Sequence, residues 1–372
     1  MAIDPRGAFV HPSPPTVGIE EELMVLDPVT LDLTPRAPGL VARAGGDPGI
    51  ATELPAAQVE LRSRPRRTVA EAAADLARGR ADLVRLGAGE VRLAGAGAHP
   101  FAAAEGEVTP GPRYLGTLRE FGAIARRQLV FGLHVHVAVR PADRALAVHD
   151  ALRSHLPELA ALAANAPFHA GRDTGLASVR PTIAGLLPRQ GVPPPARSWE
   201  ALEAALRWGA AAGAVADPAS WWWELRLNAR TGTVEVRVPD AQASVADAAA
   251  VAAVIHALTA TLAARHEAGE ALPVAETWRI AENRWWACRD GVGAHLADLE
   301  TGRREPARER LHRLIDAIAP AARELGCAEE LEAARGLVER DLPGRWRAVA
   351  ADRGSRGLVG WLADRFLPGR DG

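Results

Sequence analysis

The chain contains no lysine, so all 44 of its Lys and Arg side chains are arginines. A P-loop places a lysine on the β and γ phosphates of a nucleotide, and a protein kinase uses a strand lysine for the same phosphates. Pyridoxal enzymes need a lysine for their Schiff base. The absence of lysine excludes these three classes. Any ATP chemistry in this chain must therefore rely on arginines and metal ions.

An excess of charge of either sign is also missing. The 44 basic groups face 46 acidic ones, for a net charge of −2, so no basic field exists to attract nucleic acid or anionic lipid. The opening "MAIDPRGAFVHPSPP" lacks the basic and apolar regions of a signal peptide, and no uninterrupted apolar run reaches about 18 residues. We expect a cytoplasmic protein with neither nucleic acid nor membrane partners.

Cysteine is scarce and proline and glycine are clustered. Cys288 and Cys327 lie far apart, without the spacing of a metal knuckle or a redox pair. Proline and glycine gather at 11–15, 106–113 and 188–195, which predicts a tail and two loops. We predict a flexible tail over 1–15 and a single domain over 16–372. Its pattern is rich in strands over 16–240 and helical over 244–366.

Five segments alternate apolar and polar residues with the period of two that is typical of half-buried strands. Such alternation indicates antiparallel strands with one face packed, whereas buried parallel strands are apolar throughout. The sequence therefore predicts an α+β fold rather than a Rossmann type. The five polar faces carry Glu20 and Glu22; Gln58, Glu60 and Arg62; His134 and His136; Glu224, Arg226 and Asn228; and Thr233, Glu235 and Arg237.

The residue types on these faces suggest a binding site, although a polar face that simply meets water is the alternative. Glu20 and Glu22 share one face and would repel each other unless a cation lay between them. Carboxylates outnumber histidines, which favours magnesium or manganese over zinc. Arg226 and Arg237 could hold a phosphate or carboxylate in a bidentate fork. Metals with arginines suggest phosphoryl transfer from ATP.

Two other interpretations remain open from the residues alone. His134 and His136 form an H-x-H pair, with which the zinc site of a metal-dependent amidohydrolase also begins. That site needs further histidines and often a modified lysine, and it leaves the glutamates unexplained. The third interpretation is a non-catalytic protein that binds a nucleotide or an amino acid.

The motifs "GIEEE", "TELPAAQVEL", "FGLHVHV", "GRDTG" and "TVEVRV" occur in this order along the chain. Together they resemble the bacterial carboxylate-amine ligase family that includes the type 2 glutamate-cysteine ligases. The resemblance implies a fold like that of glutamine synthetase, in which helices cover a curved antiparallel sheet with a polar concave active-site face. It also suggests a homodimer.

The activity that the resemblance implies is the ATP-dependent formation of a γ-glutamyl amide. L-Glutamate would react with ATP to give an acyl phosphate, and an amine such as L-cysteine would displace the phosphate, with Mg²⁺ or Mn²⁺ as cofactor. Relatives often carry aromatic residues where this chain has Leu176, Val179 and Thr231. The resemblance therefore leaves the amine open.

The resemblance and the strand faces together nominate the site residues. The metal ligands would be Glu20, Glu22, Glu53, Glu60, His134 and Glu235. Catalytic roles fall on Arg237, Glu235 and Arg226, and ATP or substrate binding on His136, Arg62, Arg172, Asp173, Asn228 and Arg230. Glu21 points to the opposite face and is expected to be structural. Trp221 and Trp223 are predicted in the core, whereas Trp222 could line the site or a subunit contact.

Overall fold

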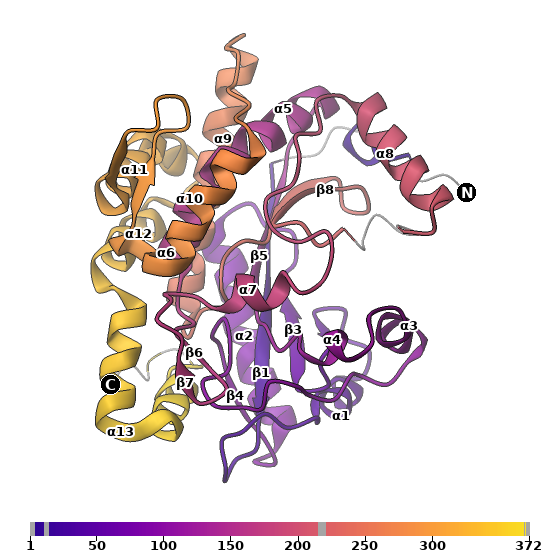
Figure 1. Ribbon diagram of the computed structural model, residues 1–372, viewed down its shortest axis with the longest axis vertical. Helices are drawn as coiled ribbons and strands as arrows, with labels where there is room; N and C mark the ends of the chain where they lie inside the picture. Colours follow the sequence, from indigo (N-terminus) through magenta and orange to yellow (C-terminus); the bar gives the residue numbers. More distant parts are fainter. Residues whose placement is uncertain (1–3, 11–14, 215–220, 368, 370–372) are drawn as a thin grey trace.

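One open antiparallel sheet organises the computed structural model, which describes residues 4–10, 15–214, 221–367 and 369 (Figure 1). Over these residues the sheet has seven strands in the order β2-β3-β1-β5-β9-β8, and β4 also pairs with β1. The strands are β1 (Val17–Leu26), β2 (Ile50–Thr52), β3 (Gln58–Arg62), β4 (Arg92–Ala94), β5 (Leu133–Ala138), β8 (Leu225–Asn228) and β9 (Thr233–Val236). The five predicted segments correspond to β1, β3, β5, β8 and β9. The predicted α+β class and antiparallel pairing are confirmed.

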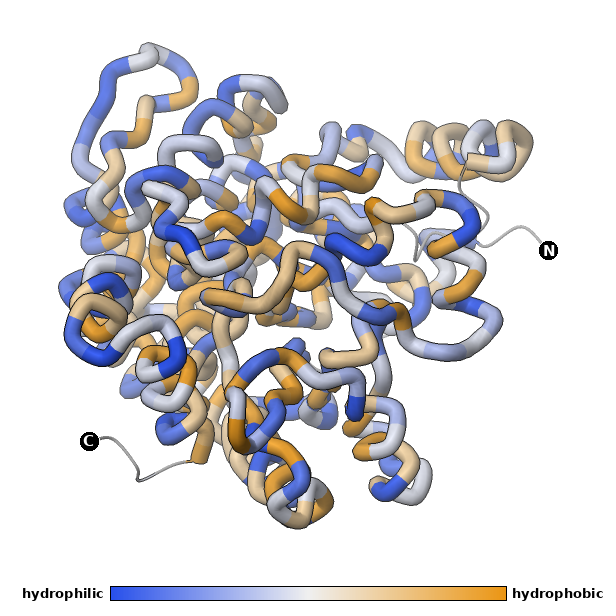
Figure 2. The backbone as a smooth tube through the Cα atoms, turned by 60° about the horizontal axis from the view of Figure 1, so that its bottom comes forward, coloured by the Kyte–Doolittle hydropathy of each residue, from blue (hydrophilic) through white to orange (hydrophobic). Residues whose placement is uncertain are grey.

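The apolar face of the sheet is covered by α2 (Val69–Gly87), α5 (Ala142–Leu152) and α9 (Val245–Glu267). Ile19, Val59, Val135 and Val236 are all buried on this face. The helix α9 lies between the sheet and a second helical layer formed by α11 (Ala307–Glu324) and α12 (Ala328–Arg340). In Figure 2 the coils of several helices alternate between blue and orange, as amphipathic helices do. The polar face of the sheet lies on the side opposite α2, α5 and α9.

The remaining elements surround this core. The helices are α1 (Ala37–Arg43), α3 (Pro112–Phe121), α4 (Ala123–Arg126), α6 (Leu156–Ala163), α7 (Arg180–Ala184), α8 (Trp199–Ala211), α10 (Thr277–Asp290) and α13 (Leu342–Asp364). Short 3-10 turns occur at Gly7–Phe9, Arg153–His155 and Gly291–Gly293. Two small hairpins pair β6 (Phe168–His169) with β7 (Arg172–Asp173) and β10 (His295–Ala297) with β11 (Arg304–Pro306). The β10–β11 hairpin interrupts the region that the sequence predicts as helical.

Glu21 lies on the apolar face of β1, where its charge is neutralised by a buried arginine. Both Glu21 and Arg80 of α2 have fully buried side chains, and Arg80 donates to the two carboxylate oxygens at 2.6 and 2.9 Å. The same guanidinium donates to the carbonyls of Gln242, Ala243 and Phe366. The predicted structural role of Glu21 is confirmed.

Part of the expected tail is packed onto the domain rather than flexible. Residues 4–10 include the turn Gly7–Phe9, and the side chain of Phe9 is fully buried. An aromatic residue fixed in the core cannot belong to a free tail, because its packing orders the backbone around it. Residues 1–3 and 11–14 of the expected tail lie outside the described residues.

The helix α9 is long and apolar enough to cross a membrane by length and composition, although the sequence contains no uninterrupted apolar run of that length and predicts no such span. In the structure, 78% of its apolar window is buried inside the protein. Its apolar residues therefore serve as the core between the sheet and the outer helices.

Candidate active site

A cavity of about 530 Å³ opens on the polar face of the sheet. Its wall contains eleven of the predicted site residues: Glu20, Glu22, Glu53, Glu60, Arg62, His134, His136, Arg226, Asn228, Arg230 and Arg237. Glu235 is fully buried in the layer directly behind this wall. The strands bring these side chains together because β1 pairs with both β3 and β5, and β9 pairs with both β5 and β8.

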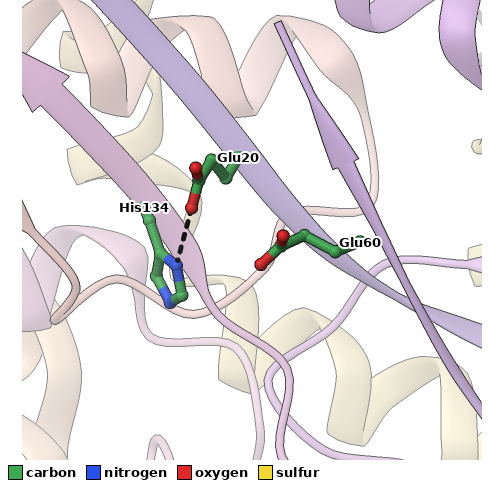
Figure 3. A group of neighbouring side chains, drawn as sticks. All are labelled: Glu20, Glu60 and His134. Carbon is green, nitrogen blue, oxygen red and sulfur yellow. Dashed lines mark ion pairs between the residues drawn. The ribbon is translucent and has the colours of Figure 1, made fainter. Parts of the chain in front are cut away.

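The first possible metal-binding group consists of Glu20 on β1, Glu60 on β3 and His134 on β5. One ligand atom from each residue lies within 4.8 Å of the other two. Figure 3 shows the three side chains pointing toward one another, with the His134 Nδ1 atom 3.5 Å from Glu20 Oε2. The Nε2 atom of His134 is buried and lacks a hydrogen-bond partner among the described residues. Such an orphaned nitrogen is available to a metal ion.

A second group shares Glu20 and adds His136 and Glu235, again within 4.8 Å of one another. The His136 Nε2 atom lies 3.4 Å from Glu20 Oε1 and 3.8 Å from Glu235 Oε1. The opposite ring nitrogen, Nδ1, lies 2.9 Å from the hydroxyl of Thr233, which fixes the ring orientation. A hydrogen bond to the other ring nitrogen is typical of a histidine that holds a metal.

The carboxylates repel one another in the absence of a cation. Burial, together with the charge of Glu53, raises the pKa of Glu22 to about 7. Burial and the charges of Glu53 and Glu20 raise the pKa of Glu60 well above its ordinary value, with Arg62 only partly offsetting them. A protein that buries acids in this way without full pairing destabilises their charged form. A divalent cation would relieve that repulsion, so the donor set fits Mg²⁺ or Mn²⁺.

The pKa values of Glu20, His134 and His136 are shifted for different reasons. Burial by itself raises the pKa of Glu20, but hydrogen bonds and charge from His134 and His136 hold that pKa below the ordinary value. Burial and the nearby Arg237 lower the pKa of His134 to about 3, so this imidazole is neutral at pH 7, the form that binds metals. Burial opposes protonation of His136, yet Glu235 and Glu20 raise its pKa.

Glu235 also anchors two arginines at the cavity. Arg226 Nε donates to Glu235 Oε2 at 2.5 Å, and Arg237 Nη1 donates to Glu235 Oε1 at 2.6 Å. Asn228 adds a third hydrogen bond to Oε2 at 2.8 Å. Burial raises the pKa of Glu235, but the charges of Arg226, His136 and Arg237 bring that pKa well below its ordinary value. The pair of guanidinium groups makes this side of the cavity suited to an anion.

Two predicted residues lie elsewhere. Arg172 and Asp173 form the exposed strand β7 and are not part of the cavity wall. Asp173 instead forms a bidentate ion pair with Arg347 of α13, at 2.7 and 2.9 Å. Trp222 does line the cavity, as the sequence suggested, whereas Trp221 and Trp223 are only half-buried and border a separate apolar cavity.

Arg180, the first residue of α7, was not among the residues that the sequence predicts for the site. Its guanidinium lines the cavity and donates to the carbonyls of Arg237 and Val238 at 3.1 Å each. Gly132, just before β5, makes room for it, because a Cβ at position 132 would overlap Arg180 Nη2. The same glycine N–H donates to Glu22 at 2.5 Å. The only signal available was that Arg180 follows the "GRDTG" motif by a few residues.

Comparison with known families gives a match over most of the chain. The sequence profile of the glutamate-cysteine ligase family 2 (GCS2) matches residues 16–355. A Rubrobacter xylanophilus protein provisionally named glutamate–cysteine ligase 2-3 is 41% identical over 363 residues, which cover 95% of this chain and 97% of that protein. A Gloeobacter violaceus protein provisionally named glutamate–cysteine ligase 2 is 33% identical and covers 96% and 97%.

Solved structures resemble the fold at low sequence identity. A glutamate–cysteine ligase from Francisella tularensis, solved in complex with AMP, aligns with a TM-score of 0.71 at 13% identity, covering 96% of this chain and 90% of that one. The complex of the prokaryotic ubiquitin-like protein Pup and its ligase PafA aligns with a TM-score of 0.52 at 13% identity, covering 96% and 70%. From the profile match and the sequence relatives, the chain belongs to the glutamate-cysteine ligase family 2, a family of ligases.

Proposed function

We propose that the protein is an ATP-dependent ligase that joins the γ-carboxylate of L-glutamate to an amine such as L-cysteine. The observation that carries the proposal is the convergence of two carboxylate and histidine groups on Glu20, with Arg226 and Arg237 beside them. Family membership supports this choice of reaction. The Francisella tularensis ligase, a structural neighbour, was solved with AMP, which supports a nucleotide as the ligand of the cavity.

In the proposed reaction, a carboxylate oxygen of glutamate attacks the γ-phosphorus of ATP, and the bond from that phosphorus to ADP breaks. The amine nitrogen then attacks the acyl carbon of the resulting acyl phosphate. Phosphate leaves with the electron pair of the carbon–oxygen bond, and the amine loses a proton. Each step moves charge onto phosphate oxygens, so catalysis depends on positioning and charge neutralisation more than on a protein nucleophile.

The residues of the cavity suit these needs. Glu20, Glu60 and His134, and Glu20, His136 and Glu235, would hold Mg²⁺ or Mn²⁺, with Glu22 and Glu53 adjoining them in the cavity wall. When bound, such ions neutralise charge that develops on phosphate oxygens. Arg226 and Arg237 are held rigidly by Glu235 and can orient an anionic group of either substrate.

The two rival interpretations fit the geometry less well. Each possible metal-binding group contains one histidine and two carboxylates, which suits a hard oxygen-binding ion better than a histidine-rich zinc site. A non-catalytic binding protein would have no need for buried carboxylates that repel one another. A cytoplasmic location and a homodimer stay predictions; sedimentation of the purified protein would test the latter.

The test is phosphate release from ATP and Mg²⁺ with L-glutamate and a panel of amines that includes L-cysteine. We expect release that depends on the amine, that stops when a chelator is added and that is lost in Glu20→Gln and Glu235→Gln. Glu90 is exposed and is not part of the cavity wall, so Glu90→Gln is the matched control and should retain activity. The absence of release with every amine, despite MgATP binding, would contradict the choice of glutamate or the catalytic role itself.

An isotope experiment tests the acyl phosphate separately. If glutamate carries ¹⁸O in its γ-carboxylate, one labelled oxygen must appear in the released phosphate for each amide formed. Unlabelled phosphate from a reaction that does form the amide would exclude the acyl phosphate while leaving the ligase activity intact.

A further inference from the structure

Residues 4–10 belong to the segment that the sequence predicts as a tail. They pack against the β8–β9 turn, residues 229–232. Phe9 is fully buried, and its ring lies 5.3 Å from that of Trp199 at the start of α8. The guanidinium of Arg140 lies 5.3 Å from the centroid of the Phe9 ring. Phe9 therefore fixes the segment to α8 and to the chain just after β5.

The segment and the turn touch through their backbones at Gly232. A Cβ at this position would overlap both the carbonyl oxygen of Ala8 and the guanidinium of Arg140. Gly232 also has a φ of +64°, in the left-handed region that favours glycine. Arg140 donates hydrogen bonds to the carbonyls of Val139 and Gly232, so it links the end of β5 to the turn.

The β8–β9 turn contributes residues to the cavity wall. Arg230 and Thr231 both line the cavity. The Asn228 side-chain oxygen accepts from the backbone N–H groups of Arg230 and Thr231 at 3.1 and 3.2 Å, which shapes the turn. The Thr231 hydroxyl lies 2.8 Å from that of Thr233, which in turn lies 2.9 Å from His136 Nδ1. A continuous chain of contacts thus runs from the turn to a possible metal-binding histidine.

From these contacts we propose that the segment around Phe9 fixes the β8–β9 turn and so positions Arg230 and His136 in the cavity. Phe9, Arg140 and Gly232 are positioning residues: they act through the turn and lie outside the cavity wall. The group that Arg230 would receive is anionic, a phosphate of the nucleotide or a substrate carboxylate; this last step rests on the proposed function.

The contact itself is tested by thermal unfolding of wild type, Phe9→Ala, Gly232→Ala and the double variant. In the wild type, an added methyl at 232 meets the Ala8 carbonyl. In the Phe9→Ala background the segment is no longer anchored, so the methyl can push it aside. We expect Gly232→Ala to lower the Tm less in the Phe9→Ala background than in the wild type. Strictly additive losses would overturn the proposal.

The positioning role is tested by calorimetric titration with MgATP. Phe9→Ala should weaken binding by about fivefold or more, whereas Val10→Ala, at an exposed neighbouring position, should not. Arg230→Gln should weaken binding in the wild type and add little in the Phe9→Ala background. A lower Tm with unchanged MgATP affinity in Phe9→Ala would overturn the positioning role. If the wild type binds no MgATP, the proposed function is contradicted instead. The Tm values of the single and double variants would still test the contact between the Phe9 segment and Gly232.

Discussion

Glu20 is the residue that the two possible metal-binding groups have in common. It lies on β1, opposite His134 of β5 on one side and Arg62 of β3 on the other. Glu60 belongs to the first group alone, and Glu235 to the second alone. The loss of Glu20 should therefore affect both groups, and the loss of Glu60 only one.

We expect Glu20→Gln to weaken Mn²⁺ binding at both groups by at least about 100-fold, since even an outer-shell partner contributes roughly 10- to 100-fold. Glu60→Gln should leave the group of Glu20, His136 and Glu235 able to bind. Mn²⁺ titration followed by electron paramagnetic resonance gives the stoichiometry of each variant. Equal residual binding in the two variants would contradict a shared role for Glu20.

Glu22 would make metal binding in the cavity sensitive to pH. Its pKa is raised from 4.5 to about 7, so between these values the folded protein keeps a proton that the unfolded chain has released. Stability of the metal-free protein should fall as the pH rises through this window, because the folded state binds more protons. The charge of a cation bound beside Glu22 would lower the pKa of this carboxyl, so binding should release protons at pH 6 and fewer at pH 8.

Calorimetry of Mn²⁺ binding in buffers with different ionisation enthalpies counts those protons. Glu22→Gln should lower the number released at pH 6, although Glu60 keeps its own contribution. Proton release that does not change between pH 6 and pH 8 would argue against a raised pKa in the cavity.

Arg172 and Arg180 are close in sequence but differ in their position relative to the cavity. Arg172 is exposed in β7, whereas Arg180 lines the cavity and is held by the carbonyls of Arg237 and Val238. We expect Arg180→Gln to lower kcat/KM for amide formation by about 10-fold or more, equivalent to about 1.4 kcal/mol, and Arg172→Gln to change it little. The reverse order would place the substrate-binding arginine at position 172, as the family resemblance implied.

At the scale of elements, the buried pair of Glu21 and Arg80 joins β1 to α2. Both charges are out of water, and Arg80 also ties α2 to the carbonyls of Gln242, Ala243 and Phe366. Removal of one partner leaves an uncompensated buried charge, which is more costly than the loss of the whole pair. The pair thus adds an anchor to the strand that carries Glu20 and Glu22.

We expect Arg80→Met to lower the free energy of unfolding by about 3 to 5 kcal/mol. The double variant Glu21→Leu with Arg80→Met should lose less than the sum of the two single variants. Urea denaturation of the wild type, the two single variants and the double variant gives the four free energies of unfolding. If the losses of the single variants simply add up in the double variant, the pair does not act as a unit.

For the whole molecule, the central helix α9 carries one group that should lower stability in acid. His256 is buried on it, and both of its ring nitrogens lack partners among the described residues. Burial lowers the pKa of His256 from 6.5 to about 4. Below pH 6.5 the unfolded chain takes up a proton at this residue that the folded protein does not, so stability falls between pH 6.5 and pH 4.

The predicted size of this effect is up to about 3 kcal/mol, because one pKa unit corresponds to about 1.4 kcal/mol. His256→Leu should remove this contribution to the pH dependence of stability. It also removes two buried ring nitrogens that lack partners among the described residues. Urea denaturation at pH 7 and pH 5 measures the contribution. If the variant loses as much stability between these pH values as the wild type does, His256 is not responsible.

Much of the cavity wall could be predicted because it depends on local periodicity. Alternate residues of a strand share a face, so Glu20 and Glu22 had to point together and Glu21 had to point into the core. The absence of lysine likewise limited the chemistry before any folding was considered. Arg180 could not be found in this way, because it lies on a short helix whose position relative to β5 is not encoded in any local pattern.

The order of residues along each strand is enough to say which carboxylates, histidines and arginines share a face. Which faces meet depends on strand pairing: β1 pairs with β3 and β5, so Glu20 lies opposite both Arg62 and His134. Only the tertiary structure decided that Phe9 is core and that Arg180 lines the cavity while Arg172 does not. The physical reason is that periodicity fixes a side chain's direction along one element, whereas pairing and packing depend on contacts between residues far apart in the chain.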